Sequence, residues 1–186
     1  MDLTGIGFRL IIIKNVQMVI DLQNTKKIAS GAMLAAACTA IMLLGAVLEL
    51  GMYAAPLLVG LLLIPYGQKY GAKYQLVVFA AVSLLSFMLV PNIEQNLMFT
   101  GLFGWYPILR PALQRLYKVP RLISKLLIFN VTVIAIETLV MLVLVPEAMG
   151  SILMIILLAL GNATFLLYDY IIPIMSIRLE KLRQLM

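Results

Sequence analysis

Two carboxylates, Glu137 and Asp169, lie inside long apolar stretches of the sequence. Ionisable side chains are costly to bury at membrane depth, so their presence there commonly marks a functional site. Each follows an asparagine (Asn130 and Asn162, respectively) by seven residues. That spacing puts both members of a pair on one helical face, roughly 10 Å apart along the axis. These four side chains are therefore the first candidates for binding a ligand, and the two carboxylates are candidates for accepting a proton.

A second candidate is the segment Phe103-Gly104-Trp105-Tyr106-Pro107. Glycine and proline interrupt regular helix here, and irregular backbone at membrane depth has to line protein or a cavity. Trp105 and Tyr106 have flat faces that suit stacking on a ligand ring, whereas the alternative role is anchoring at a membrane interface. Their position well inside an apolar run counts against anchoring.

The residue types that commonly carry catalysis are scarce in this chain. It contains no histidine, which removes the commonest general base and transition-metal ligand. Its one cysteine, Cys38, forms no disulfide within the chain. No nucleophile elbow, phosphate-binding glycine loop or HExxH helix occurs. We therefore expect neither an enzyme nor a bound metal or cofactor.

The composition is that of an integral membrane protein. Of the 186 residues, 63% are hydrophobic and 12% are charged, which is too little charge to cover a soluble domain. The net charge of +6 comes without the dense basic run of a nucleic-acid binder. We expect membrane lipid around the protein and no nucleic acid bound to it.

Six apolar runs approach the roughly 20 helical residues needed to cross a bilayer. They lie at about 28–48, 52–66, 74–90, 97–113, 122–145 and 152–177. The second run is short, and Pro107 and Pro111 break the fourth. The expected fold is an all-α integral membrane bundle of six transmembrane helices.

The basic residues predict the orientation of this bundle. All fourteen Lys and Arg fall before the first run, between the second and third, around the fourth-to-fifth connection, or at the C-terminal end. The other three connections carry Glu49, Glu94 and Glu147 instead. By the positive-inside rule, both termini are cytoplasmic. We expect a multi-pass protein of the cell membrane, in a bacterial plasma membrane.

The chain is divided here into residues 1–25 and a transmembrane domain at 26–186. The first segment is apolar but interrupted by Arg9 and Lys14, so it is too charged to span. It is either an interfacial helix on the cytoplasmic face or a weakly ordered extension.

The last two runs are antiparallel, so their polar residues are expected to pair across them. Counting about 1.5 Å per residue from the external connection pairs Glu137 with Asn162 in the outer half, and Asn130 with Asp169 further in. The outer pair is either an interhelical contact, worth about 0.6–2 kcal/mol, or part of a ligand pocket open to the outside. The inner pair is expected to be structural, with Asp169 also able to pair with Arg110.

The first run is rich in small side chains. Ala32, Ala36 and Ala40 fall at i, i+4 and i+8 and form one ridge on a helix, here called the alanine ridge. Such a ridge lets another helix approach closely, so that packing and Cα–H contacts replace contacts with lipid. The partner is either a helix of the same chain or a separate membrane subunit.

A lysine pair followed by alanines spaced by four, in a six-helix chain with both ends inside, resembles the substrate-binding S component of energy-coupling factor (ECF) vitamin transporters. In that family an AxxxA motif on the first helix meets coupling helices of the transmembrane partner. Ala32 and Ala36 match this motif, and Ala40 extends it. The resemblance implies a transmembrane coupling subunit and cytoplasmic ATPases as partners. It also implies a pocket for a small-molecule substrate in the outer half, at Glu137 and Asn162.

The leading hypothesis is a substrate-binding subunit of a multisubunit importer for a vitamin-like molecule, with Glu137, Asn162, Trp105 and Tyr106 as substrate-binding residues. One alternative is a non-catalytic membrane interaction or assembly protein whose polar residues hold helices together. Another is a lipid-modifying membrane enzyme with Glu137 or Asp169 as general base. An outward-open pocket among the last three runs favours the importer, and a solid bundle favours the assembly protein.

The topology is tested by cysteine labelling. Cysteines introduced at Glu94 and Glu147 are expected to react with an impermeant thiol reagent added to intact cells, because both connections face outward. A cysteine at Lys118 is expected to react only after the membrane is opened. Labelling at Lys118 in intact cells contradicts the six-helix arrangement.

Overall fold

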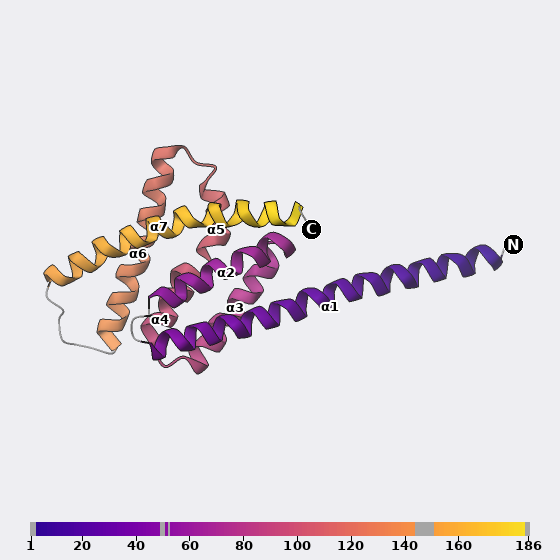
Figure 1. Ribbon diagram of the computed structural model, residues 1–186, viewed down its shortest axis with the longest axis horizontal. Helices are drawn as coiled ribbons and strands as arrows, with labels where there is room; N and C mark the ends of the chain where they lie inside the picture. The colour runs from indigo at the N-terminus through magenta and orange to yellow at the C-terminus, as the bar shows by residue number, and fades with distance from the viewer. Residues whose placement is uncertain (1–2, 49–50, 52, 144–150, 185–186) are drawn as a thin grey trace.

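The computed structural model describes residues 3–48, 51, 53–143 and 151–184, with side chains for 24–48, 51, 53–140, 142, 158–175 and 177. Every regular element within these ranges is a helix, so the predicted all-helical fold class is confirmed there. The elements in chain order are α1 (Leu3–Val47), α2 (Ala54–Tyr70), α3 (Ala72–Leu89), α4 (Ile93–Met98), the π-helical η2 (Phe99–Phe103), α5 (Tyr106–Leu113), α6 (Lys118–Val143) and α7 (Ser151–Gln184) (Figure 1).

Four helices of the described chain are long and apolar enough to cross a membrane, as a multi-pass membrane protein requires. Their candidate spans are Asn24–Val47 in α1, Ala72–Leu89 in α3, Lys118–Val140 in α6 and Leu158–Met175 in α7. They correspond to the first, third, fifth and sixth apolar runs. The count of six spans stays a prediction.

The two other runs form shorter helices for local reasons. α2 has 17 residues, with Pro65 inside it. It is therefore about 26 Å long, a little short of the hydrocarbon thickness. The fourth run is divided among α4, η2 and α5, with Trp105 between the last two. Gly104 and Pro107 lie at this break, as the sequence suggested.

α1 joins the N-terminal segment and the first span in one helix. It runs without a break past Lys26 and Lys27, and its N-terminal part extends beyond the other helices (Figure 1). No proline occurs before Pro56, so nothing in the sequence forces the helix to stop earlier. The expected division after residue 25 is not a helix boundary.

Two apolar cores share α2 between them. α1, α2 and α3 pack around residues that include Cys38, Met42, Val59, Leu63 and Val82. The other face of α2 packs with η2, α5, α6 and α7 around residues that include Leu61, Phe103, Phe129, Phe165 and Tyr168. α2 is thus enclosed by protein on two sides, which suits a helix that is short for the bilayer.

Close approach on the second face depends on Gly60. A Cβ atom at this position would lie 2.4 Å from the carbonyl oxygen of Phe103 and 2.5 Å from Tyr168 Oη. Both distances are far below a van der Waals contact, so only glycine fits. The Tyr168 hydroxyl donates to the same Phe103 carbonyl at 3.0 Å, which joins α7 to η2 beside α2.

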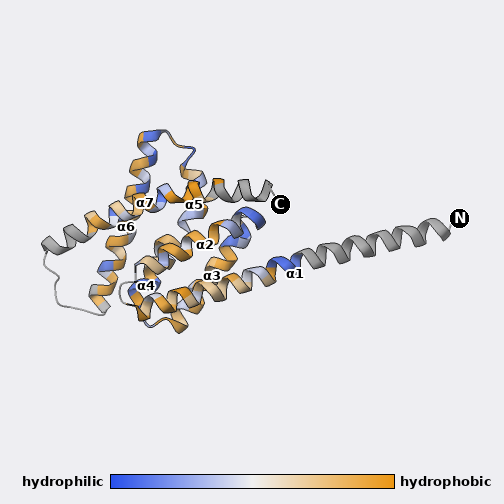
Figure 2. Cartoon of the chain, viewed as in Figure 1, coloured by the Kyte–Doolittle hydropathy of each residue, from blue (hydrophilic) through white to orange (hydrophobic). Residues whose placement is uncertain are grey.

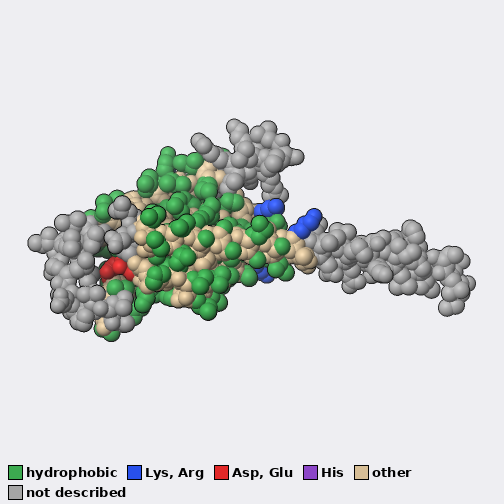
Figure 3. Space-filling model, turned by 60° about the horizontal axis from the view of Figure 1, so that its bottom comes forward, with side chains coloured by type: hydrophobic (Ala, Val, Ile, Leu, Met, Phe, Trp, Pro, Cys, Tyr) green, Lys and Arg blue, Asp and Glu red, His purple; other side chains and the backbone are tan. Residues whose placement is uncertain are grey.

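Charged side chains separate toward opposite ends of the bundle. Hydrophilic residues gather near the α2–α3 turn and at the start of α6, with apolar stretches between the helix ends (Figure 2). On the face shown in Figure 3, Lys and Arg side chains lie toward one end and the visible acidic side chains toward the other. Asp169 is an exception, since it is paired with Arg110 and Lys125. At the acidic end Tyr53 Oη donates to Glu94 Oε1 at 2.6 Å. The orientation of the bundle in the membrane stays a prediction.

Candidate functional site

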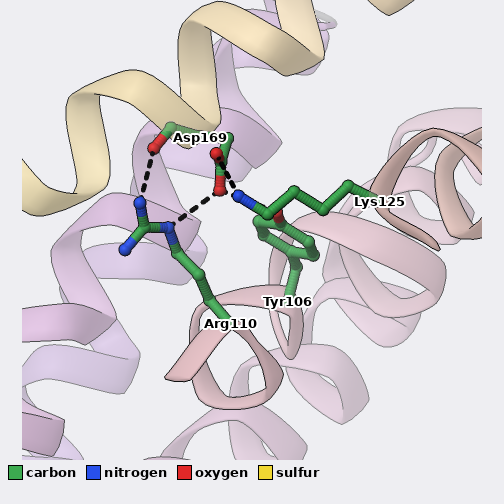
Figure 4. Close-up of polar contacts among 4 residues, drawn as sticks. All are labelled: Tyr106, Arg110, Lys125 and Asp169. Atoms are coloured by element: carbon green, nitrogen blue, oxygen red, sulfur yellow. Dashed lines mark hydrogen bonds and ion pairs between the residues drawn. The ribbon is translucent and has the colours of Figure 1, made fainter. Parts of the chain in front are cut away.

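Asp169 of α7 is the centre of a buried polar cluster. Its Oδ1 accepts from Tyr106 Oη at 2.7 Å and from Arg110 Nε at 2.8 Å, and its Oδ2 pairs with Lys125 Nζ at 2.5 Å. Arg110 Nη2 also donates to the backbone oxygen of Asp169 at 3.2 Å (Figure 4). The expected pair of Asp169 with Arg110 is therefore present. Sequence reasoning did not find Tyr106 and Lys125 as its further partners.

The local sequence explains how α5 supplies two of these donors. Tyr106 and Arg110 are four residues apart, so their side chains lie on one face of this short helix. Pro107 occupies the first turn, where a missing N–H costs nothing. The Tyr106 ring packs edge-on against Phe165 with ring centroids 4.9 Å apart, which holds its hydroxyl toward α7. The i, i+4 spacing was the available signal for Tyr106.

The cluster has more positive than negative charge. Lys125 is 6% exposed, and the side chains of Arg110 and Asp169 are 12% and 15% exposed. Two cations thus share one carboxylate in a largely dry setting. The other carboxylates among the described side chains, Glu94 and Glu137, lie elsewhere. Because three donors already occupy the Asp169 oxygens, the arrangement suits a structural ion cluster better than a general base.

Asn130 of α6 and Asn162 of α7 bond to each other in both directions. The two Nδ2–Oδ1 distances are 3.1 and 2.9 Å. Each Nδ2 also donates to the carbonyl four residues earlier in its own helix, at 2.8 Å. The predicted pairings of Glu137 with Asn162 and of Asn130 with Asp169 are therefore wrong.

The error lies in the assumed centre of the α6–α7 connection. The midpoint of the residue numbers is 146 for the observed partners Asn130 and Asn162, and 147 for Lys125 and Asp169. Residue 147 is also the middle of the connection between the two helices, residues 144–150. The predicted pairs, 137 with 162 and 130 with 169, both average to 149.5. In two antiparallel helices, moving the assumed midpoint of the connection by one residue changes the expected partner of each residue by two positions. A shift of about three residues therefore accounts for the wrong partners.

The predicted substrate-binding residues lie in three different places. Tyr106 is in the Asp169 cluster, and Asn162 is paired with Asn130. Trp105 Nε1 donates to the backbone oxygen of Gly101 at 2.7 Å. Glu137 is half-buried and close enough to Glu94 for the two charges to interact. A binding role for these four residues stays a prediction, and none of them lines the cavity described below.

The alanine ridge lies on the outside of α1. Ala32, Ala36 and Ala40 are all exposed, whereas the buried face of α1 carries other residues, among them Ala35 and Cys38. Packing within the described chain therefore uses the neighbouring face. The ridge is left for contact with lipid or with another protein.

Comparison with protein-family models, curated proteins and solved structures found no match to this chain. The functional argument therefore rests on the contacts of the chain itself. Three features enter it: the Asp169 cluster, the paired asparagines and the exposed alanine ridge.

The structural role of the Asp169 cluster is tested by removing one charge at a time. Asp169→Asn leaves Arg110 and Lys125 buried without a counter-charge, and we expect it to destabilise the protein by about 3–5 kcal/mol. Lys125→Met leaves a neutral Asp169–Arg110 pair, so its effect is expected to be much smaller. Unfolding in detergent, followed by circular dichroism, measures both. Equal stability of the two variants contradicts this account.

Proposed function

We propose that this chain is the substrate-binding subunit of a multisubunit membrane importer, and that it docks its transmembrane coupling subunit on the alanine ridge of α1. The subunit itself is non-catalytic. The observation that carries the proposal is the outward position of Ala32, Ala36 and Ala40.

A contrast with other exposed faces supports a protein partner at the ridge. Lipid-accessible positions of α3 and α6 carry large apolar side chains, such as Leu84 (70% exposed), Met88 (82%) and Leu127 (60%). Large side chains give the greater gain from contact with acyl chains. Small side chains instead bring two backbones close together, which is an advantage only against another helix. The occupant that fits is an apolar helix of the coupling subunit, with small residues of its own.

The acidic end of the bundle is the proposed place of substrate entry. Glu137 is half-buried there, and its charge, like that of Glu94, acts on the phenol of Tyr53. By the proposed orientation this end faces outward. The substrate class, a vitamin-like small molecule, follows from the resemblance to S components and is part of the proposal.

An assembly protein without a substrate is the second candidate, and the polar contacts favour it. Asn130 and Asn162 satisfy each other, and Asp169 is surrounded by its own donors. In that case the same ridge docks a partner, and the polar residues only hold helices together. The two candidates differ in whether a small molecule binds.

Docking is tested with Ala36→Leu, because one leucine on the ridge holds two backbones apart. Complexes purified in mild detergent from the native membrane are analysed by native mass spectrometry. We expect at least a tenfold loss of the coupling subunit and ATPases from the variant. Ala80→Leu, the same change at an exposed position of α3, is the control and is expected to retain them. A retained complex in the Ala36→Leu variant, or loss of folding in the isolated variant, removes the support that the ridge gives.

Substrate binding is tested with Glu137→Gln. Small molecules that copurify with the protein are first identified by mass spectrometry, and their affinity is then measured for each variant. If Glu137 contacts the substrate, we expect affinity to fall at least tenfold, or about 1.4 kcal/mol, with little change in thermal stability. Thr138→Ala, at the exposed neighbouring position, is the control. Unchanged affinity excludes Glu137 from the site, and the absence of any copurifying molecule favours the assembly protein.

A further inference from the structure

A cavity of about 360 Å³ lies at the basic end of the bundle, where α2, α3, α5 and α7 meet. Gln68, Ala72 and Gln114 of its wall are exposed, whereas Gln75 and Pro107 are buried. The space therefore extends from an open mouth near the α2–α3 turn to a buried interior. Its wall also includes Ile64, Ile108, Ile172 and Ile177, so it is apolar along much of its length.

Arg110 gives this wall a charge that is not balanced locally. Its Nε and Nη2 donate to Asp169, but Asp169 is also paired with Lys125. Of the other carboxylates with described side chains, Glu137 lies 12 residues along α6 from Lys125, about 18 Å away. Glu94 follows the C-terminal end of α3, whereas the cavity lies at the start of that helix. Among the side chains that the structure describes, one positive charge therefore remains beside the cavity.

Gln114 partly covers this charge at the mouth. With its amide oxygen turned toward Arg110, it accepts from Nη1 at 2.5 Å and from Nη2 at 3.1 Å. Because the Gln114 side chain is exposed, an anionic ligand can displace it at little cost.

Gln75 is a second polar group that faces this cavity. Its side chain lines the cavity and is 6% exposed, and its Nε2 is buried without a hydrogen-bond partner among the described residues. A buried donor left in this state is costly. Gly67 makes room for it, since a Cβ atom there would overlap the Gln75 amide oxygen. The Gln75 amide is thus packed closely against Gly67, while its Nε2 donor lacks an acceptor among the described residues.

We propose that this cavity binds a phosphate group through the Arg110 guanidinium and the Gln75 amide. The apolar wall suits an attached hydrocarbon chain, and the mouth lies at the basic end, beside the α2–α3 turn. The group comes either from the headgroup of an anionic membrane lipid or from a soluble phosphate. This site is separate from the importer proposal and does not depend on it.

The test uses the full chain in nanodiscs of phosphatidylcholine. One arm adds a fraction of phosphatidylglycerol, and native mass spectrometry counts the lipids retained on the protein. The other arm titrates inorganic phosphate and follows the thermal unfolding temperature. Selective retention of phosphatidylglycerol identifies a lipid source, and stabilisation by phosphate alone identifies a soluble one. The absence of both effects overturns the proposal.

Two variants connect the binding to this site. Gln75→Met removes the donor and keeps the volume, whereas Lys125→Met leaves the wall intact but lets Asp169 neutralise Arg110. We expect each to weaken binding at least fivefold. Lys118→Met, an exposed change on the same helix, is expected to bind like the parent. If Gln75→Met does not fold, Lys125→Met carries the test. Parent-like binding by a folded Gln75→Met or by Lys125→Met overturns the proposal.

Discussion

A carboxylate buried among apolar helices has to be surrounded by donors, and Asp169 obtains them from two other helices at once. Tyr106 and Arg110 come from α5, and Lys125 comes from α6. Each contact is directional, so the depth of α7 is tied to the depth of both neighbours. The paired asparagines add a second point of attachment between α6 and α7, where the alternative for an amide in hydrocarbon is an unsatisfied group. Polar contacts therefore specify the register of the second core, while its aromatic residues provide the packing.

α2 connects this polar half to the apolar half of the molecule. Its two faces belong to different cores, and Gly60 allows η2 and α7 to come close on the second of them. The cavity lies where α2 ends and the neighbouring helices continue, beside the charge that Asp169 does not balance. The C-terminal end of α2 and the Arg110 charge thus both border the cavity.

The four candidate spans were predictable because hydrocarbon thickness imposes a length and a composition, and these are visible in an apolar run of the sequence. The Asp169–Arg110 pair was predictable because an ionised group at that depth needs a partner and few are available. Lys125 was counted among the basic residues around the connection between the fourth and fifth apolar runs. In the structure it turns inward to Asp169 instead. The outward direction of the alanine ridge was not predictable, because the buried face of α1 also carries small residues such as Gly31 and Ala35. Periodicity alone does not distinguish two such faces.

The place of α2 between two cores has a consequence for biosynthesis. α1 and α2 leave the ribosome early, and α3 follows directly, so the first core can close at once. The residues that cover Gly60 on the other side include Tyr168, which is 108 positions later in the chain. At about 5–20 residues per second, this interval lasts roughly 5–22 s. Until α7 arrives, this face of α2 is covered only in part, by η2 and α5, and the nascent chain depends on lipid or on the insertion machinery to shield the rest.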